Sequence, residues 1–181
     1  MGGGDLTALK KETVAPQVCS ASFKIFRAPP ARGKVPGWPS SPAQSLFEAL
    51  PGAWVLHREI EDARLGAGAF VGRASFAPQA DGRLLYEEHG ELQLGARRGP
   101  AWRRWIYALE GDALAVRYPD TLDELHLFRF GDGRSAQHRH FCGADCYQAD
   151  LSRGADDSFS LLYAVSGPAK DYRLRTVLTR V

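Results

Sequence analysis

The densest set of side chains able to do chemistry lies in residues 137–147, which have the sequence QHRHFCGADCY. Because side chains alternate between the two faces of a β-strand, His138, His140 and Cys142 share one face. Imidazole and thiolate bind zinc and other borderline metals. However, successive ligands on one face lie about 6.5–7 Å apart, so at most two of these three side chains reach one ion. We therefore assign no metal site and interpret the row, with Tyr147, as polar side chains that line a ligand cavity.

A second set of candidate groups lies on the strand predicted after residue 82. Tyr86 and Glu88 share one face of that strand. If they face the same interior as His140 and Asp145, the cavity holds an acid, a base and a phenol, which could transfer protons once burial shifts their pKa values. The alternative is that Glu88 forms an ion pair with one of the many arginines, because a buried carboxylate needs such a partner. The sequence leaves both interpretations open.

Lys170 is the only lysine in residues 46–181, where sixteen arginines supply the other positive charges. A desolvated lysine acts as a base or forms an imine, and a lysine at a barrel mouth fixes a ligand carboxylate or phosphate as a point charge. The alternative is an exposed turn lysine paired with the adjacent Asp171. We include Lys170 among the ligand-binding candidates.

Aromatic side chains are frequent on the predicted strands and suit the wall of a cavity for a small flat or apolar ligand. They include Trp102, Trp105, Tyr107, Tyr118, Phe128 and Phe130. Tyr107 joins the ligand-binding candidates. A haem could be held through one histidine, His126 or His140. Because charged residues stand on nearly every strand, where a haem slot would be apolar, we predict no cofactor.

These side chains must be positioned by strands, because Gly, Pro and Asp divide the chain after residue 50 into short segments. One helix is predicted over residues 43–50, ended by Pro51 and Gly52. The predicted strands span residues 53–60, 67–76, 83–94, 101–109, 113–118, 124–130, 135–141, 147–151, 159–165 and 171–180.

Consecutive strands with tight connectors and no intervening helix favour antiparallel neighbours. Many of these strands carry polar and charged side chains on both faces, which a closed barrel with a partly polar interior tolerates better than a dry sandwich. We therefore predict an all-β fold. It is a single antiparallel up-and-down β-barrel, preceded by a short helix and an irregular N-terminal arm.

The N-terminal segment differs in composition from the rest of the chain. Residues 1–45 contain four lysines and two arginines, and the proline-rich run 36–42 cannot sustain a helix or a strand. We predict an irregular or disordered arm over residues 1–44 and the barrel domain over residues 45–181. The basic composition of the arm leaves open organelle targeting and the binding of a protein partner through the arm.

Charge, hydropathy and cysteine usage limit the classes of partner and the location that the sequence allows. The chain has 23 basic and 21 acidic residues in mixed order, with a net charge of +2, and so offers no continuous field to nucleic acid or an anionic membrane. No apolar run approaches the roughly 20 residues of a membrane span, so we expect a soluble protein. Three cysteines, Cys19, Cys142 and Cys146, form no disulfide framework, which indicates a reducing, cytoplasmic location. No nucleophile elbow, phosphate loop or nucleotide fingerprint is present.

The segment that leads into the first strand, residues 50–54 (LPGAW), resembles the opening of lipocalins and other calycin barrels. The resemblance implies that Trp54 closes one end of the barrel and that an arginine of the last strand, Arg180 or else Arg175, lies over its indole. A guanidinium on an aromatic face gains about 1 kcal/mol, and its donors can satisfy carbonyls at the barrel floor. Trp54 and Arg180 are therefore assigned structural roles.

Four further segments are similar to an uncharacterised family of short calycin-like domains. They are residues 70–76 (FVGRASF), 85–92 (LYEEHGEL), 140–147 (HFCGADCY) and 167–172 (GPAKDY). This resemblance covers nearly all of residues 50–181 and supports the barrel fold. The family brings no established activity, so it leaves the function open.

Three functions of different classes remain. We favour a small-molecule-binding barrel with a partly polar, aromatic-lined cavity. The first alternative is a cofactor-independent lyase, isomerase or hydrolase, which requires His140, Asp145, Tyr86 and Glu88 to converge within hydrogen-bond reach. The second alternative is a protein-interaction module, which predicts a barrel filled with side chains and an exposed apolar patch. The fold alone does not choose among them.

Overall fold

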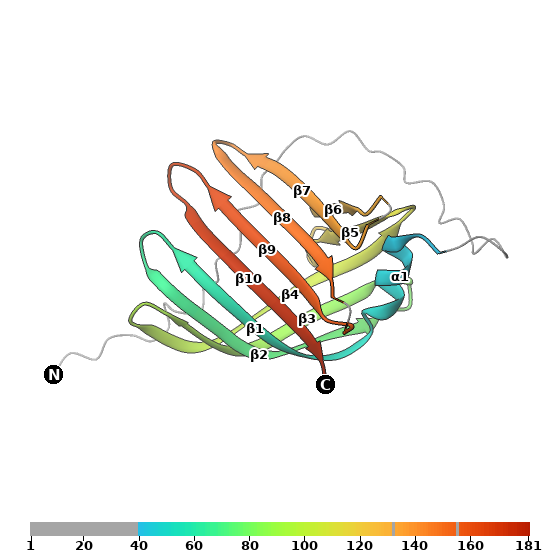
Figure 1. Cartoon of the computed structure of the whole chain (residues 1–181), viewed down its shortest axis with the longest axis horizontal. Helices are drawn as coiled ribbons and strands as arrows, with labels where there is room; N and C mark the ends of the chain where they lie inside the picture. The colour runs from blue at the N-terminus through green and yellow to red at the C-terminus, as the bar shows by residue number, and fades with distance from the viewer. Residues whose placement is uncertain (1–39, 132, 155) are drawn as a thin grey trace.

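The computed structural model describes residues 40–181, except residues 132 and 155, and the predicted arm over residues 1–44 lies almost entirely outside them. One helix precedes ten strands (Figure 1). The elements are α1 (Pro42–Ala49), β1 (Gly52–Asp62), β2 (Gly66–Pro78), β3 (Leu84–Leu94), β4 (Arg97–Glu110), β5 (Ala113–Arg117), β6 (Glu124–Arg129), β7 (Ser135–Cys142), β8 (Asp145–Arg153), β9 (Phe159–Ser166) and β10 (Asp171–Arg180).

Helix α1 begins one residue earlier than predicted, at Pro42, within the run 36–42 that was expected to sustain no helix. Ser41 is the N-cap, and its Oγ accepts a hydrogen bond from the backbone N–H of Gln44 at 3.1 Å. A proline is well suited to the first helical position because its missing N–H would have no partner there. The last proline of the run, Pro42, is therefore the first residue of the helix.

The strands form one antiparallel sheet that curls into a nearly closed barrel, which confirms the predicted fold class. The hydrogen-bonded order is β6-β5-β4-β3-β2-β1-β10-β9-β8-β7. Every ladder is antiparallel, and all but β1–β10 join strands that are consecutive in the chain. β6 and β7 are the two ends of this order and lie beside each other. We call this junction the β6–β7 seam.

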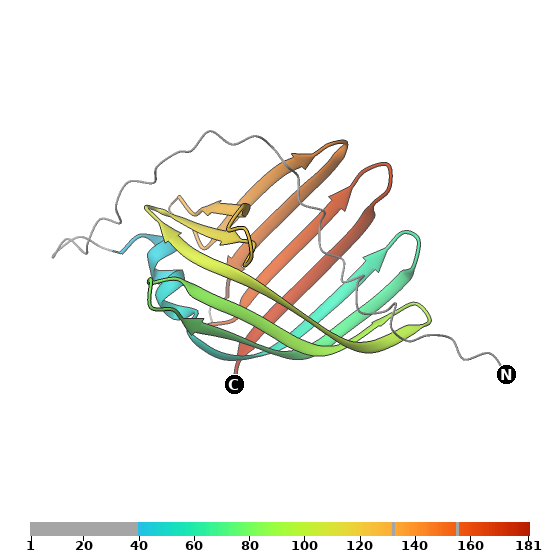
Figure 2. The same cartoon turned by 180° about the vertical axis from the view of Figure 1, so that it is seen from behind.

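β4 is longer than predicted, because it begins at Arg97 and includes Pro100. On one side β4 pairs with β3 from Arg97 to Tyr107, whereas on the other side β5 pairs only with Ile106–Glu110. Pro100 therefore lies where β4 has a free edge, and a strand tolerates proline at an edge. Seen from behind, the short β5 and β6 reach only part of the way along β4 (Figure 2).

The end of the barrel beside α1 is filled by a hydrophobic core. Trp54 is fully buried there, packs against the Phe76 and Phe159 rings, and donates a hydrogen bond from Nε1 to the Leu50 carbonyl at 2.9 Å. The Arg180 guanidinium lies 4.1 Å from the centre of the Trp54 ring. Arg180 also donates to the backbone carbonyls of α1 and of the residue before β1. These contacts hold the helix against the barrel floor.

The opposite end of the barrel holds a second, smaller buried cluster, formed by Tyr147, Val165 and Tyr172. Side chains there that share the inward face with buried neighbours are only partly buried: Leu92, Trp105, His138, His140, Tyr163 and Leu174. Solvent reaches such a side chain from inside the barrel or, at His138, through the hollow that His138 lines with Gln137, Arg139 and Gln148. Solvent therefore reaches part of the inward-facing surface at these six positions.

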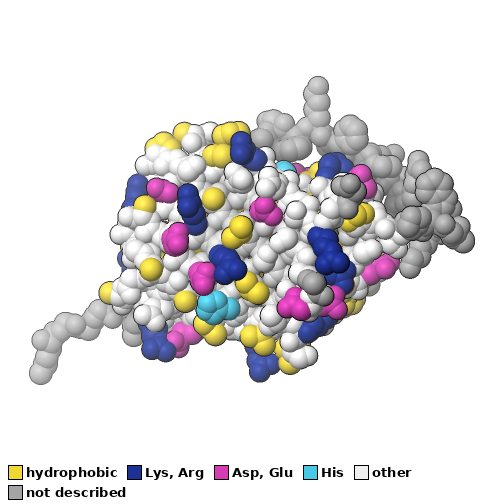
Figure 3. All heavy atoms as spheres, viewed as in Figure 1, with side chains coloured by type: hydrophobic (Ala, Val, Ile, Leu, Met, Phe, Trp, Pro, Cys, Tyr) yellow, Lys and Arg dark blue, Asp and Glu magenta, His cyan; other side chains and the backbone are white. Residues whose placement is uncertain are grey.

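The outer face shown in Figure 3 mixes basic and acidic side chains, with isolated hydrophobic ones between them. Pairs such as Glu59 and Arg175, whose closest atoms are 3.4 Å apart, bridge neighbouring strands on the exposed side. Among the residues described, no helix is long and apolar enough to cross a bilayer.

Candidate functional site

A buried ionic group crosses the middle of the barrel interior. Both guanidinium Nη atoms of Arg58, on β1, donate to the Glu88 carboxylate of β3 at 2.8 Å, and Arg58 Nε donates to Thr176 Oγ1 at 2.8 Å. Arg103 Nε, on β4, lies 2.7 Å from Glu88 Oε1, and the Tyr86 hydroxyl donates to Oε2 at 2.5 Å. Because β1 and β3 are not neighbours, this group bridges the sheet through its interior.

The ionic group fixes the charge states of its members. Burial alone would raise the pKa of Glu88, but the Arg103 and Arg58 guanidiniums outweigh it and lower that pKa to about 2. Burial and the Glu88 carboxylate raise the pKa of Tyr86 well above its usual value. Glu88 is thus an ion-pair partner, the alternative that the sequence left open. A carboxylate already neutralised by two guanidiniums is a poor proton acceptor.

Three histidines form a second group at the β6–β7 seam. His126 comes from β6, and His138 and His140 come from β7. One ligand nitrogen from each lies within 4.8 Å of those of the other two, and Nδ1 of His126 is 3.3 Å from Nδ1 of His138. The His126 ring also lies 5.4 Å from that of Tyr163 on β9. A contact between strands so far apart in the sheet order requires these side chains to point inward.

The three imidazoles are held in the neutral form. Burial, and then the neighbouring His138 and His140, lower the pKa of His126 to about 3. Burial also lowers the pKa values of His138 and His140. Nδ1 of His140 is buried and has no hydrogen-bond partner among the described residues. The group therefore offers neutral nitrogen donors, one of which is unsatisfied.

A third group joins two of the segments that carry the family resemblance. Lys170 donates to the Tyr147 hydroxyl at 2.5 Å and lies 3.0 Å from an Asp145 carboxylate oxygen. The buried Tyr147 ring stacks on His140, with centroids 4.9 Å apart and planes 3° from parallel. A Cβ on Gly167 would come within 1.9 Å of Asp145 Oδ1 and 2.9 Å of its Cα. Glycine at that position therefore allows Asp145 to approach.

The partner of Lys170 differs from the one considered in the sequence, because it is Asp145 and not the adjacent Asp171. The hydrogen bond to Tyr147, and then Asp145, raise the pKa of Lys170. Since a base or imine former must lose its proton, this lysine is suited to act as a fixed positive charge and not as a nucleophile.

The candidate residues thus fall into separate groups. Tyr86 donates to Glu88, which pairs with Arg58. Asp145 instead pairs with Lys170, and His140 stacks on Tyr147. The four side chains of the proton-transfer hypothesis do not form one hydrogen-bonded set.

The remaining candidates divide between core and surface. Tyr107 packs against the Phe76 and Tyr86 rings beside the ionic group, and burial raises its pKa to about 12. Cys142 packs against the small cluster around Tyr147. Trp102 was predicted to form part of the cavity wall. It is instead 56% exposed, because it lies on the opposite face of β4 from Trp105.

Sequence reasoning missed Arg58, Arg103, Thr176 and Tyr163. Period-2 alternation could have placed each on an inward face. What the sequence does not contain is the pairing across the interior, which brings Arg58 to Glu88 and Tyr163 to His126.

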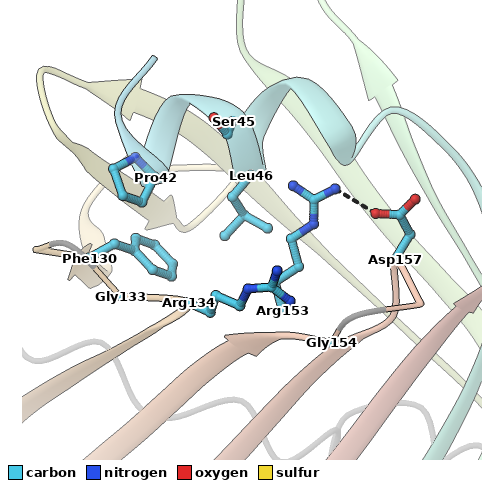
Figure 4. Close-up of a pocket in the computed structure, with 9 residues that line it drawn as sticks. All are labelled: Pro42, Ser45, Leu46, Phe130, Gly133, Arg134, Arg153, Gly154 and Asp157. Carbon is cyan, nitrogen blue, oxygen red and sulfur yellow. Dashed lines mark hydrogen bonds and ion pairs between the residues drawn. The ribbon is translucent and has the colours of Figure 1, made fainter. Parts of the chain in front are cut away.

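A separate hollow of about 390 Å³ lies at the other end of the molecule, between α1 and the loops before β7 and after β8. Figure 4 shows Leu46 and Phe130 on one side of it and Arg134 and Arg153 on the other. Arg153 is already paired with Asp157 at 2.5 Å. The hollow is therefore remote from the histidines, and one of its two arginines is already neutralised.

Residues 50–180 match a family described as a family of unknown function (DUF6314). The chain belongs to the DUF6314 family. No curated protein is detectably similar to it. The matched range of this DUF6314 protein contains all ten strands and every group described above.

Solved structures similar to the DUF6314 barrel include two redesigned β-barrels. One is mFAP1, solved bound to DFHBI, with 15% sequence identity, a TM-score of 0.42, and coverage of 75% of this chain and 98% of that one. The other, b11L5F_LGL, has 18% identity, a TM-score of 0.39, and coverage of 78% and 99%. The calycin-like resemblance drawn from the sequence motifs stays a prediction.

Proposed function

We propose that this DUF6314 barrel binds a small, partly aromatic molecule inside the end that lies away from α1. The observation that carries the proposal is the row of inward-facing but partly exposed side chains at that end. These side chains face the same interior as the buried core residues, yet part of their surface stays accessible. Interior surface that solvent reaches is surface that a ligand can cover.

The chemistry of this row suits a flat molecule with a few polar atoms. Trp105 and Tyr163 offer ring faces, and Leu92 and Leu174 offer apolar contact. His138 and His140 are neutral and can donate or accept a hydrogen bond. The few polar groups would orient the ligand, and the apolar and aromatic walls would supply most of the binding free energy.

Two observations favour binding over the alternatives. The proton-transfer hypothesis needs Tyr86 and Glu88 beside His140, yet Tyr86 donates to Glu88, and Glu88 is paired with two arginines. The interaction module predicts a filled barrel, and the partly exposed inward side chains count against it. The hollow beside α1 is a weaker ligand site, because Arg153, one of its two arginines, is already paired with Asp157.

Native mass spectrometry of the purified full-length chain, set beside its denatured mass, tests the proposal. A co-purified organic mass that disappears on denaturation supports it and indicates the ligand class. Titration with the fluorescent probe anilinonaphthalene sulfonate then locates the site through two variants. Leu174→Trp fills the interior, whereas Leu162→Trp adds the same indole to the outer face, where Leu162 is 49% exposed.

We expect Leu174→Trp to weaken probe binding by at least about tenfold, equivalent to about 1.4 kcal/mol, and Leu162→Trp to leave it unchanged. Equal affinities for the two variants, with both folded by circular dichroism, would place the probe on the outer surface. That result, together with the absence of any co-purified mass, would refute the proposal.

A further inference from the structure

The three inward histidines of the β6–β7 seam form a cluster that ligand binding alone does not explain. Residues 126, 138 and 140 account for three of the five histidines in the chain. The other two, His57 and His89, are exposed on the outer face. Because β6 and β7 are the ends of the hydrogen-bonded order, the cluster joins two strands that no backbone ladder joins in the described residues.

The spacing of the nitrogens fits a shared ion. Two ligands of a tetrahedral zinc ion, each about 2.0–2.1 Å from the metal, lie about 3.3 Å apart. Nδ1 of His126 and Nδ1 of His138 are separated by 3.3 Å. The ligand nitrogens of all three residues lie within 4.8 Å of one another. Side-chain rotation of the partly exposed His140 would close the remaining gap of about 1.5 Å to tetrahedral spacing.

The sequence argument against a metal considered only ligands along one strand. His138 and His140 are neighbours on the inward face of β7, and that argument allowed two such ligands to share an ion. The third ligand comes from β6, opposite them, and not from Cys142 further along β7. Folding therefore supplies the donor that alternation within one strand could not.

The donor set also has the right chemistry. Neutral imidazole is the form in which histidine binds a metal, and all three residues are histidines. The buried Nδ1 of His140 has no hydrogen-bond partner in the described part of the chain, as expected for a nitrogen that bonds to something else. Three imidazoles without a carboxylate favour zinc and similar ions over calcium or magnesium.

We propose that His126, His138 and His140 bind one divalent ion of the zinc class at the β6–β7 seam. Three protein ligands leave a coordination position free, as in sites where zinc also holds water or a small molecule. His138 and His140 are the partly exposed members, so this position faces the solvent-reached interior. The proposal does not depend on the proposed organic ligand, since the ion needs only the three side chains.

The experiment uses tag-free, full-length protein stripped with a chelator. Calorimetric titration with Zn²⁺ should give one ion per chain, and Co²⁺ should give the strong visible absorption of a tetrahedral nitrogen site. His138→Gln and His140→Gln should each weaken Zn²⁺ binding by about 100-fold or more, because removing a ligand costs at least as much as removing its hydrogen-bonded support. His57→Gln and His89→Gln are the matched controls and should bind as the unchanged protein does.

Two further variants keep the outcome unambiguous. His126→Gln alters a buried residue, so its fold is checked by circular dichroism, while the partly exposed His138 and His140 carry the test if it unfolds. Cys142→Ser should leave the Co²⁺ absorption unchanged. Failure of the unchanged protein to bind Zn²⁺ stoichiometrically would overturn the proposal. So would equal weakening by the controls, or loss of the absorption in Cys142→Ser. None of these results bears on anilinonaphthalene sulfonate binding, which tests the organic ligand separately.

Discussion

Replacement of Glu88 by glutamine tests whether the buried ionic group stabilises the barrel. The substitution keeps the shape of the side chain but removes the negative charge that faces Arg58 and Arg103. Arg58 is only 5% exposed, so its guanidinium would be left buried without a counter-charge. Removing one partner of a buried ion pair typically costs about 3–5 kcal/mol.

The pKa of Glu88 gives an independent magnitude. It is lowered from 4.5 to about 2 in the folded protein. Each tenfold change in proton affinity corresponds to about 1.4 kcal/mol, so the ionised carboxylate adds about 3 kcal/mol to the free energy of unfolding at neutral pH. Glu88 is 2% exposed, so little of this is lost to solvent screening. The two magnitudes agree.

Urea unfolding followed by circular dichroism measures the effect. At pH 7 we expect Glu88→Gln to lower the free energy of unfolding by about 3 kcal/mol. The control is Glu59→Gln, which removes an exposed carboxylate 3.4 Å from Arg175 and should cost less than about 1 kcal/mol. A Glu88→Gln protein within 1 kcal/mol of the unchanged chain, or no less stable than the control, would refute the argument.

The same pair of proteins has a defined pH dependence. Because folding lowers the pKa of Glu88, its stabilising contribution is present above pH 4.5 and is lost as the pH falls from there towards 2. The difference in free energy of unfolding between the unchanged protein and Glu88→Gln should therefore shrink over this range. A difference that stays constant between pH 7 and pH 2 would mean that it does not arise from the Glu88 charge.

Two further substitutions test contacts at opposite ends of the barrel. Gly167→Ala should lower the free energy of unfolding by about 1–3 kcal/mol, because the added Cβ would collide with Asp145. A thermal melting temperature equal to that of the unchanged protein would contradict this contact. Arg180→Met should lower the free energy of unfolding by about 1–2 kcal/mol, because it removes the stacked guanidinium and a 2.7 Å hydrogen bond to the Pro51 carbonyl. It should also alter the near-ultraviolet circular dichroism of Trp54. An unaltered spectrum would count against the stacking.

The strands could be predicted because each is short and bounded by turn residues. All ten are present, and the largest difference is the start of β4, which depends on β5 leaving an edge free for Pro100. The start of α1 was missed because a proline run looks like a helix breaker, although Pro42 is favourable at the first helical position. Both errors concern the ends of elements and not their existence.

The candidate site was less predictable than the strands. Alternation correctly groups Tyr86 with Glu88 and His138 with His140, because each pair shares one strand face. It cannot say that Arg58 reaches across to Glu88, or that His126 meets the β7 histidines. Those contacts depend on barrel curvature and on where the sheet ends meet. They are properties of the closed fold and not of any one strand.

At the β6–β7 seam the wall of the barrel is closed by side chains and not by a backbone ladder. Where strands share a ladder, their separation is fixed by backbone hydrogen bonds at about 4.8 Å. At the seam the hydrogen-bonded order of strands ends on both sides, and the rings of His126 and His138 meet across it instead. Side chains can change rotamer without breaking a ladder, so the wall can widen or tighten there around whatever lies inside. The three histidines would then hold β6 and β7 together. An ion bound by them would fix the distance between the two strands and so the width of the interior.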